Sequence, residues 1–168
     1  MKFALIQSGR IVRTQDFDGP PPVLPEAKGL AWLELIEKPQ PEYNPLTNTL
    51  IPADPLIQDG RCITRWAVVD LPVEVAQANL AAAEASRIAN LWQAAHDYEF
   101  EQISGSAIGL LAMGVMMGKP KCLAVQNWIK SIWTLYYTRK ATGDDSTDFS
   151  TCGECPHSVP ELMAELGV

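Results

Sequence analysis

The chain has 168 residues, of which 47% are hydrophobic and 20% are charged, so a packed core can form and wholesale disorder is excluded. The net charge of −7 repels phosphate backbones, so no nucleic-acid partner is expected. Residues 1–10 lack the apolar stretch of roughly 7–15 residues that a secretory signal requires, so export by that route is not expected.

The first third of the chain is predicted to form an antiparallel β unit. Residues 3–7 and 11–14 are short apolar runs around Ser8-Gly9-Arg10, and Gly9 can supply the positive φ of a hairpin turn. A further strand is predicted over residues 29–37. The clearest β pattern follows Asp59-Gly60, a favoured type I′ turn pair, and continues to Asp70.

Proline is concentrated in the same region, with nine of the 13 prolines before residue 60. Proline cannot donate a hydrogen bond to a neighbouring strand, which confines it to sheet edges and strand ends. This distribution predicts that the strands are short and lie at sheet edges.

Helical patterns begin after Leu71. Pro72 and Glu74 suit a first helical turn, and neither proline nor glycine occurs in residues 73–103. The sequence predicts a long helix over residues 73–102, an apolar helix over 106–117, an amphipathic helix over 121–140 and a short helix over 159–166. The expected fold class is therefore α+β: a small N-terminal antiparallel β unit, residues 1–70, followed by a C-terminal helical bundle of three to four helices, residues 71–168.

Residues 107–117 form the longest apolar stretch, which is shorter than the about 20 residues needed to span a membrane. We therefore expect a core helix and no membrane partner. The spacing of Gly105 with Gly109, and of Gly114 with Gly118, predicts close approach of another helix.

The strongest amphipathic pattern is an apolar stripe in residues 125–136, expected to face residues 80–95. Tryptophan anchors both cores and interfaces, so the stripe has two interpretations. In the first, Trp92 and Trp133 are core residues. In the second, Trp128, Trp133 and Tyr136 form a protein-interaction surface.

One segment has a composition suited to chemistry: Cys152-Gly153-Glu154-Cys155-Pro156-His157. Cys152, Cys155 and His157 could supply three zinc ligands, or the two thiols could act in redox chemistry. No second pair of ligands lies at a suitable spacing, so a purely structural role is the third alternative. Cys62 and Cys122 are expected to be small buried hydrophobic residues, and the acidic residues after His96 are expected to form a solvated helix face.

The sequence contains no nucleophile elbow, phosphate-binding glycine loop or HExxH pair, so a non-enzymatic protein without a cofactor is expected. Residues 41–47 (PEYNPLT), Asp59-Gly60 and residues 65–74 (RWAVVDLPVE) resemble the small tail-fibre assembly and tail-associated proteins of tailed phages and prophages. Those proteins have a short β-rich head followed by a long helix rich in Ala and Glu.

The resemblance implies a protein that assembles or forms part of a phage tail by protein–protein interaction. Its implied partners are other phage tail proteins, with self-association into a homo-oligomer as an alternative. Its implied location is the host cytoplasm or the virion. The alternative function is a small zinc-binding or thiol-redox module that uses the Cys152–His157 segment.

Overall fold

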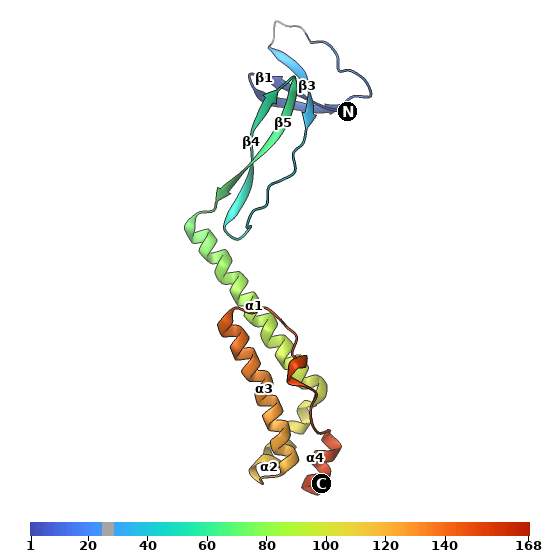
Figure 1. Cartoon of the computed structure of the whole chain (residues 1–168), viewed down its shortest axis with the longest axis vertical. Coiled ribbons are helices and arrows are strands. Elements are labelled where there is room, and N and C mark those ends of the chain that lie inside the picture. Colours follow the sequence, from blue (N-terminus) through green and yellow to red (C-terminus); the bar gives the residue numbers. More distant parts are fainter. Residues whose placement is uncertain (25–28) are drawn as a thin grey trace. The chain divides into compact units, whose positions relative to one another are not determined.

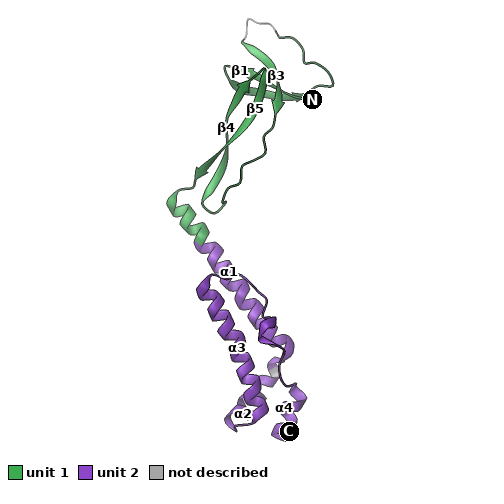
Figure 2. Cartoon of the chain, in the orientation of Figure 1, with its two compact units in different colours: residues 1–80 green, residues 81–168 purple. Residues whose placement is uncertain are grey.

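The computed structural model of the chain describes residues 1–24 and 29–168, apart from the side chain of Ser106 (Figure 1). Contacts divide the chain into two compact units, Met1–Leu80 and Ala81–Val168 (Figure 2). The first unit contains a five-stranded sheet and the second contains helices, so the predicted α+β fold class is confirmed. The division falls inside the first helix, α1 (Val73–Gln102).

The sheet has the strand order β2-β1-β3-β5-β4. Its strands are β1 (Lys2–Gln7), β2 (Arg10–Asp16), β3 (Leu30–Ile36), β4 (Asn48–Gln58) and β5 (Arg61–Asp70). Three of the pairings, β1–β2, β1–β3 and β4–β5, are antiparallel, as expected. The β3–β5 pairing is parallel and joins Glu34–Ile36 to Arg61–Ile63, so the sheet is mixed at this one junction.

Both predicted hairpin turns are present. Ser8 and Gly9 have φ values of 49° and 79°, and Asp59 and Gly60 have φ values of 50° and 70°. Two successive residues with positive φ define a type I′ turn, whose twist matches that of the flanking strands.

The prediction of short edge strands is wrong for the second hairpin. β4 has 11 residues and β5 has 10, and β5 lies between β3 and β4 rather than at an edge. Pro52 and Pro55 are tolerated because β4 is the edge strand. The register shifts between Ala53 and Leu56, which leaves Pro55 outside the paired residues.

The core of the first unit is small. Its buried hydrophobic residues are Ala4, Ile6, Leu35 and Cys62. Ile11 and Leu33 pack partly against them, and the buried position of Cys62 confirms its predicted role. A core of this size covers only part of the apolar surface of five strands.

The second unit contains the remainder of α1 followed by α2 (Ile108–Met116), α3 (Pro120–Thr142) and α4 (Val159–Leu166), with 3₁₀ turns η2 (Gly105–Ala107) and η3 (Ser150–Cys152). The four predicted helices are therefore all present. Pro120 starts α3, and Gly143, with φ of 76°, ends it. In α4 the Ser158 and Glu161 side chains form a capping box.

α1 and α3 lie side by side in this unit (Figure 1) and share its core. Leu91 and Ala95 of α1 are fully buried together with Val125 and Ile132 of α3, which confirms that the two predicted stripes face each other. Further buried members of this cluster are Ile103, Ala107, Leu111, Cys122, Trp128, Tyr136, Phe149 and Leu162.

α2 packs closely on α3 through Gly114. A Cβ atom at Gly114 would lie 2.1 Å from the Cys122 Sγ, so only glycine fits there. The predicted close approach is thus found at Gly114, whereas Gly109 faces open space. Among the described residues, no single helix is long and apolar enough to cross a membrane; α2 and α3 meet the criterion of length and composition only as a pair bent by 117°.

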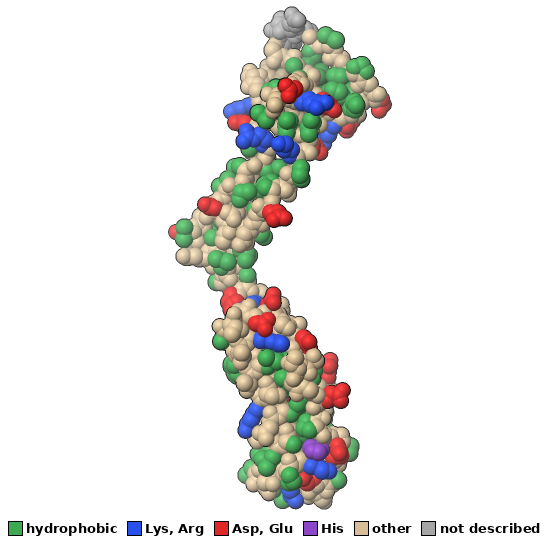
Figure 3. All heavy atoms as spheres, in the orientation of Figure 1, with side chains coloured by type: hydrophobic (Ala, Val, Ile, Leu, Met, Phe, Trp, Pro, Cys, Tyr) green, Lys and Arg blue, Asp and Glu red, His purple; other side chains and the backbone are tan. Residues whose placement is uncertain are grey.

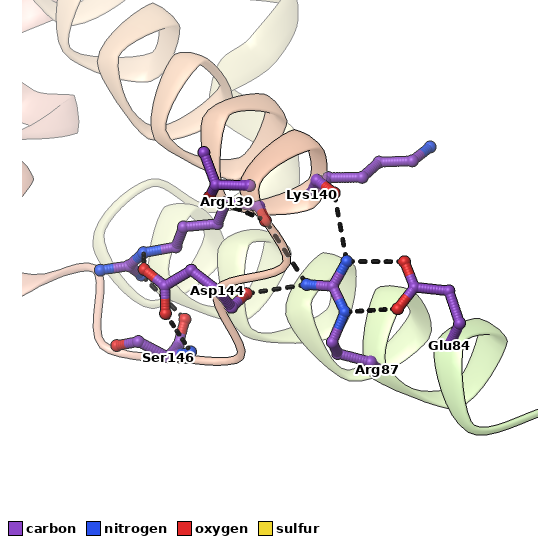
Figure 4. Close-up of polar contacts among 7 residues, drawn as sticks. Glu84, Arg87, Arg139, Lys140, Asp144 and Ser146 are labelled. Atoms are coloured by element: carbon purple, nitrogen blue, oxygen red, sulfur yellow. Dashed lines mark hydrogen bonds and ion pairs between the residues drawn. The ribbon is translucent and has the colours of Figure 1, made fainter. Parts of the chain in front are cut away.

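Arg87 of α1 contacts the C-terminal end of α3 (Figure 4). Its guanidinium donates to both oxygens of Glu84 at 2.7 Å, and to the backbone carbonyl oxygens of Lys140 at 3.1 Å and Asp144 at 2.8 Å. Arg139, which is buried, donates to the Ser146 carbonyl oxygen at 3.0 Å. The Lys140 carbonyl group is one that the end of a helix leaves without a partner, and the Asp144 and Ser146 contacts fix the loop that follows α3.

Candidate functional site

The Cys152–His157 segment is attached to the helices by hydrogen bonds. The Gly153 carbonyl oxygen accepts from the Tyr98 hydroxyl at 2.9 Å and from the Trp128 indole N–H at 2.7 Å. The Cys155 backbone N–H donates to the Gln102 side-chain oxygen. An open groove borders the segment and is lined by residues that include Tyr98, Gln102, Cys155 and His157.

The surroundings of the Cys155 thiol favour its protonated form. The Cys155 thiol donates a hydrogen bond to the His157 carbonyl oxygen at 3.2 Å, and burial raises the pKa of this thiol. All four cysteines are free thiols. A nucleophilic cysteine needs a lowered pKa, so this environment does not activate Cys155.

The predicted zinc ligands, Cys152, Cys155 and His157, lie on this segment. The imidazole Nδ1 of His157 lies 3.9 Å from the Glu161 carboxylate. In the described part of the chain, no group of three or more His, Cys, Asp or Glu side chains is arranged to hold a metal ion. The zinc-binding or thiol-redox function stays a prediction.

The three predicted interaction residues of α3 contact this chain's own core. Trp128 and Tyr136 are buried, with 6% and 5% of their surface exposed. Trp133 is partly buried, and its indole N–H donates to the Glu99 carboxylate at 2.8 Å. An interaction role for these residues stays a prediction, and other residues provide the exposed apolar surface.

The β4–β5 hairpin exposes large apolar side chains on both of its faces. Side chains alternate between faces along a strand, and partners in the register share a face. The pairing therefore places Ile51, Leu56 and Val69 on one face, and Ile57 and Val68 on the other. Each of these five side chains is at least 40% exposed. We call them the β4–β5 surface.

α1 has a second apolar surface, on the side of the helix away from the buried Leu91 and Ala95. It consists of Ala82, Ala85, Ala89, Trp92, His96 and Phe100. We call this set the α1 stripe.

Aromatic rings stack along the C-terminal half of the α1 stripe. The His96 ring stacks on Trp92 at 4.9 Å and on Phe100 at 4.2 Å between centroids. Trp92 is 44% exposed and Phe100 39% exposed, so the prediction of Trp92 as a core residue is wrong. The Trp92 ring lies 6.4 Å from the ring of Trp133, which packs partly against the core.

The sequence contains a signal for the α1 stripe that the apolar pattern alone did not resolve. Leu91 and Trp92 are adjacent, and both belong to apolar stripes of helical spacing. Neighbouring residues point about 100° apart on a helix, so only one of the two can face α3. The structure shows that it is Leu91.

Comparisons with known proteins leave the chain without a detected relative: no family model matches it, and no significant match is found among curated proteins or solved structures.

Proposed function

We propose that this chain is a non-enzymatic assembly or structural protein of a phage or prophage tail, and that it acts by binding other tail proteins. Support comes from the resemblance of residues 41–47, 59–60 and 65–74 to tail-associated proteins. The β-rich unit followed by a long helix is the layout that the resemblance implies.

The β4–β5 surface is the observation that carries the proposal. Figure 3 shows hydrophobic side chains on the surface of this hairpin. Ile51, Ile57 and Val68 are each 44% exposed, and Leu56 and Val69 are each 40% exposed. Ile51 and Val69 are diagonal neighbours on one face of the hairpin, and covering such apolar neighbours with another protein removes apolar area from water.

The shape of this surface indicates the kind of partner. Beyond the parallel contact with β3 at Arg61–Ile63, β5 pairs with β4 alone within residues 1–24 and 29–168, so a large part of the hairpin is a two-stranded ribbon. Such a ribbon is marginally stable by itself and gains from a protein that covers a face. We expect a folded tail protein to pack on the face formed by Ile51, Leu56 and Val69.

The test is co-expression of the tagged chain with the tail genes that neighbour its own gene, followed by affinity capture. The wild-type chain is expected to retain at least one tail protein. Replacing Ile51 and Val69 together by threonine keeps β-branched residues in the strands but removes apolar surface, and is expected to weaken capture at least tenfold.

Thr49→Ser is the matched control, because Thr49 pairs with Val69 and is already exposed and polar. Capture by this variant should equal that of the wild type. A gene neighbourhood without tail genes, or a wild-type chain that retains no tail protein, would contradict the proposal. Unchanged capture by the double variant would move the binding surface away from β4–β5.

A further inference from the structure

We propose that the α1 stripe binds the α1 stripe of a second copy of this chain, with the two helices antiparallel. The proposal rests on the proposed function, in which the chain acts by binding proteins, and it names one such partner. Three features of α1 support it: the spacing of the stripe, its charge and its size pattern. The exposed surface area of the whole chain is a fourth argument.

The spacing of the stripe is that of a helix–helix seam. From Ala82 to His96 its members are separated alternately by three and four residues, at positions 82, 85, 89, 92 and 96. This alternation is the heptad pattern of the a and d positions in a coiled coil. The occupant that matches it is therefore another helix.

The charge of the stripe allows that helix to be an identical one. Over the full stripe, residues 82–100, the charged side chains are Glu84, Arg87, Asp97 and Glu99. Arg87 binds Glu84 and the end of α3, and Glu99 accepts from the Trp133 indole. Ser86 and Gln93, which flank the stripe, are uncharged. The middle of the stripe, residues 85–96, contains no acidic side chain, so two copies of a chain with a net charge of −7 can meet there without like-charge repulsion.

The size pattern of the stripe fixes the relative direction of the helices. Its N-terminal half contains alanines, and its C-terminal half contains Trp92, His96 and Phe100. Antiparallel pairing about the middle of the stripe places Ala85 opposite His96, and Ala89 opposite Trp92, of the second copy. Large residues then meet small ones at both of these positions, as in a well-packed core, whereas parallel pairing would leave alanines facing alanines. Such a contact is self-complementary under a two-fold axis.

The exposed area of the chain is large enough to supply this interface. Two separate compact domains of half this mass would together expose about 9,900 Å². The chain exposes 10927 Å². The surplus of about 1,000 Å² exceeds the about 800 Å² that each partner buries in a standard interface.

Sedimentation velocity on the full chain tests the proposal. The wild type is expected to sediment as a dimer. Ala89→Glu places a charge in the centre of the stripe at an exposed position, so the fold should be kept while self-association weakens at least tenfold. Ala85→Glu is a second variant with the same expectation, should the first lose its helical circular dichroism.

Asn90→Glu is the matched control. Asn90 is exposed and adjacent to Ala89, but it lies on the side of α1 away from the stripe. This variant adds the same charge to the same helical turn and is expected to remain dimeric. Equal effects of Ala89→Glu and Asn90→Glu would overturn the proposal.

The antiparallel register has its own test. Ala85→Lys and His96→Glu should each weaken self-association. A mixture of the two variants should restore it, because the introduced lysine of one copy would meet the introduced glutamate of the other. Failure of the mixture to associate would overturn the antiparallel arrangement.

A wild-type chain that stays monomeric up to about 100 μM, the range of weak association, would overturn self-association altogether. The proposed function fails separately: it is contradicted when no tail protein is captured, whatever the oligomeric state. An Ala89→Glu monomer that still captures tail proteins would support both proposals and place them on different surfaces.

Discussion

Arg87 is the residue through which α1 satisfies the C-terminal end of α3. The last carbonyl groups of a helix have no partner within it and carry partial negative charge, which favours a cation. The guanidinium meets this need with a planar set of donors, and Glu84 holds it in place through two hydrogen bonds (Figure 4). The Glu84 contact lowers the pKa of that carboxyl group and raises the pKa of the guanidinium.

Arg87→Lys is expected to lower the thermal unfolding midpoint more than Glu84→Gln does. A lysine keeps the positive charge but cannot donate to two carbonyl groups and a carboxylate in one plane. Glu84→Gln removes the ion pair but leaves Arg87 able to bond the carbonyl oxygens of Lys140 and Asp144. Thermal unfolding followed by circular dichroism measures both. If Glu84→Gln lowers the unfolding midpoint below that of the wild type as much as Arg87→Lys does, the ion pair, and not the carbonyl contacts, stabilises this junction.

The second residue of interest is Cys155, whose folded environment favours the thiol over the thiolate. Burial raises its pKa above the ordinary value, so the folded state holds this proton more tightly than the unfolded state does. The stability that Cys155 contributes is therefore fully present below the ordinary thiol pKa, and it is lost as pH rises from there through the raised pKa of the folded state.

We expect Cys155 in a Cys152→Ser background to react with iodoacetamide more slowly than the same chain in urea at pH 8. The difference should narrow as the pH rises, because more of the folded protein then carries the thiolate. A double Cys152→Ser, Cys155→Ser variant gives the background rate. Faster reaction of the folded protein at pH 7, or stoichiometric zinc in the wild type that Cys155→Ser removes, would favour the zinc-binding or thiol-redox alternative instead.

At the scale of elements, the contact between α2 and α3 depends on a single glycine. A Cβ atom at Gly114 would lie 2.1 Å from the Sγ and 2.8 Å from the Cβ of Cys122, so the helices would have to separate. Gly109, one to two turns earlier in α2, faces open space. The two glycines lie in the same helix, but only Gly114 is required for the packing of α2 on α3.

Gly114→Ala is expected to destabilise the protein by about 1–3 kcal/mol, the cost of overpacking a core. Gly109→Ala is the matched control and should stabilise α2 by about 0.5–1 kcal/mol, because alanine favours the helix and meets no neighbour. Urea unfolding measures both. A double Gly114→Ala, Cys122→Ala variant should recover part of the loss; no recovery would show that the clash lies elsewhere.

The helices could be predicted from the sequence, whereas the sheet could be predicted only in part. Pro72, Gly118 with Pro120, and Gly143 mark helix ends that the structure reproduces. The turns at Gly9 and Gly60 were equally informative, because glycine there has a local conformational cause. The parallel pairing of β3 with β5 has no local signal, since it joins residues far apart in sequence.

The prolines of β4 predicted a short strand, and this expectation was wrong because strand pairing depends on residues far apart in the sequence. Pro52 and Pro55 suggest a short strand locally, but the edge position of β4 and its shift of register accommodate both. Among the candidate sites, the Cys152–His157 segment was visible from composition, whereas the exposure of Trp92 was not. The exposure of Trp92 depends on which side of α1 packs against α3, and that is decided by tertiary structure.

At the scale of the whole molecule, the chain has two hydrophobic cores of unequal size. Among the residues that the structure describes, the core of the first unit consists of the buried Ala4, Ile6, Leu35 and Cys62. The core of the second unit combines α1, α2, α3 and α4, and includes the fully buried Ile132. Because each unit encloses its own core, a loss of packing in one should leave the packing of the other intact.

Leu35→Ala and Ile132→Ala test this separation, since each removes a buried side chain from one core and is expected to cost that unit about 2–5 kcal/mol. Hydrogen exchange followed by mass spectrometry resolves the two effects. Leu35→Ala should accelerate exchange in β1, β3 and β5 but not in α3, because those strands surround the cavity that it leaves. Ile132→Ala should do the reverse. Faster exchange in both units on either change would mean that they unfold as one cooperative structure, and the small core of the first unit would then depend on the second for its stability.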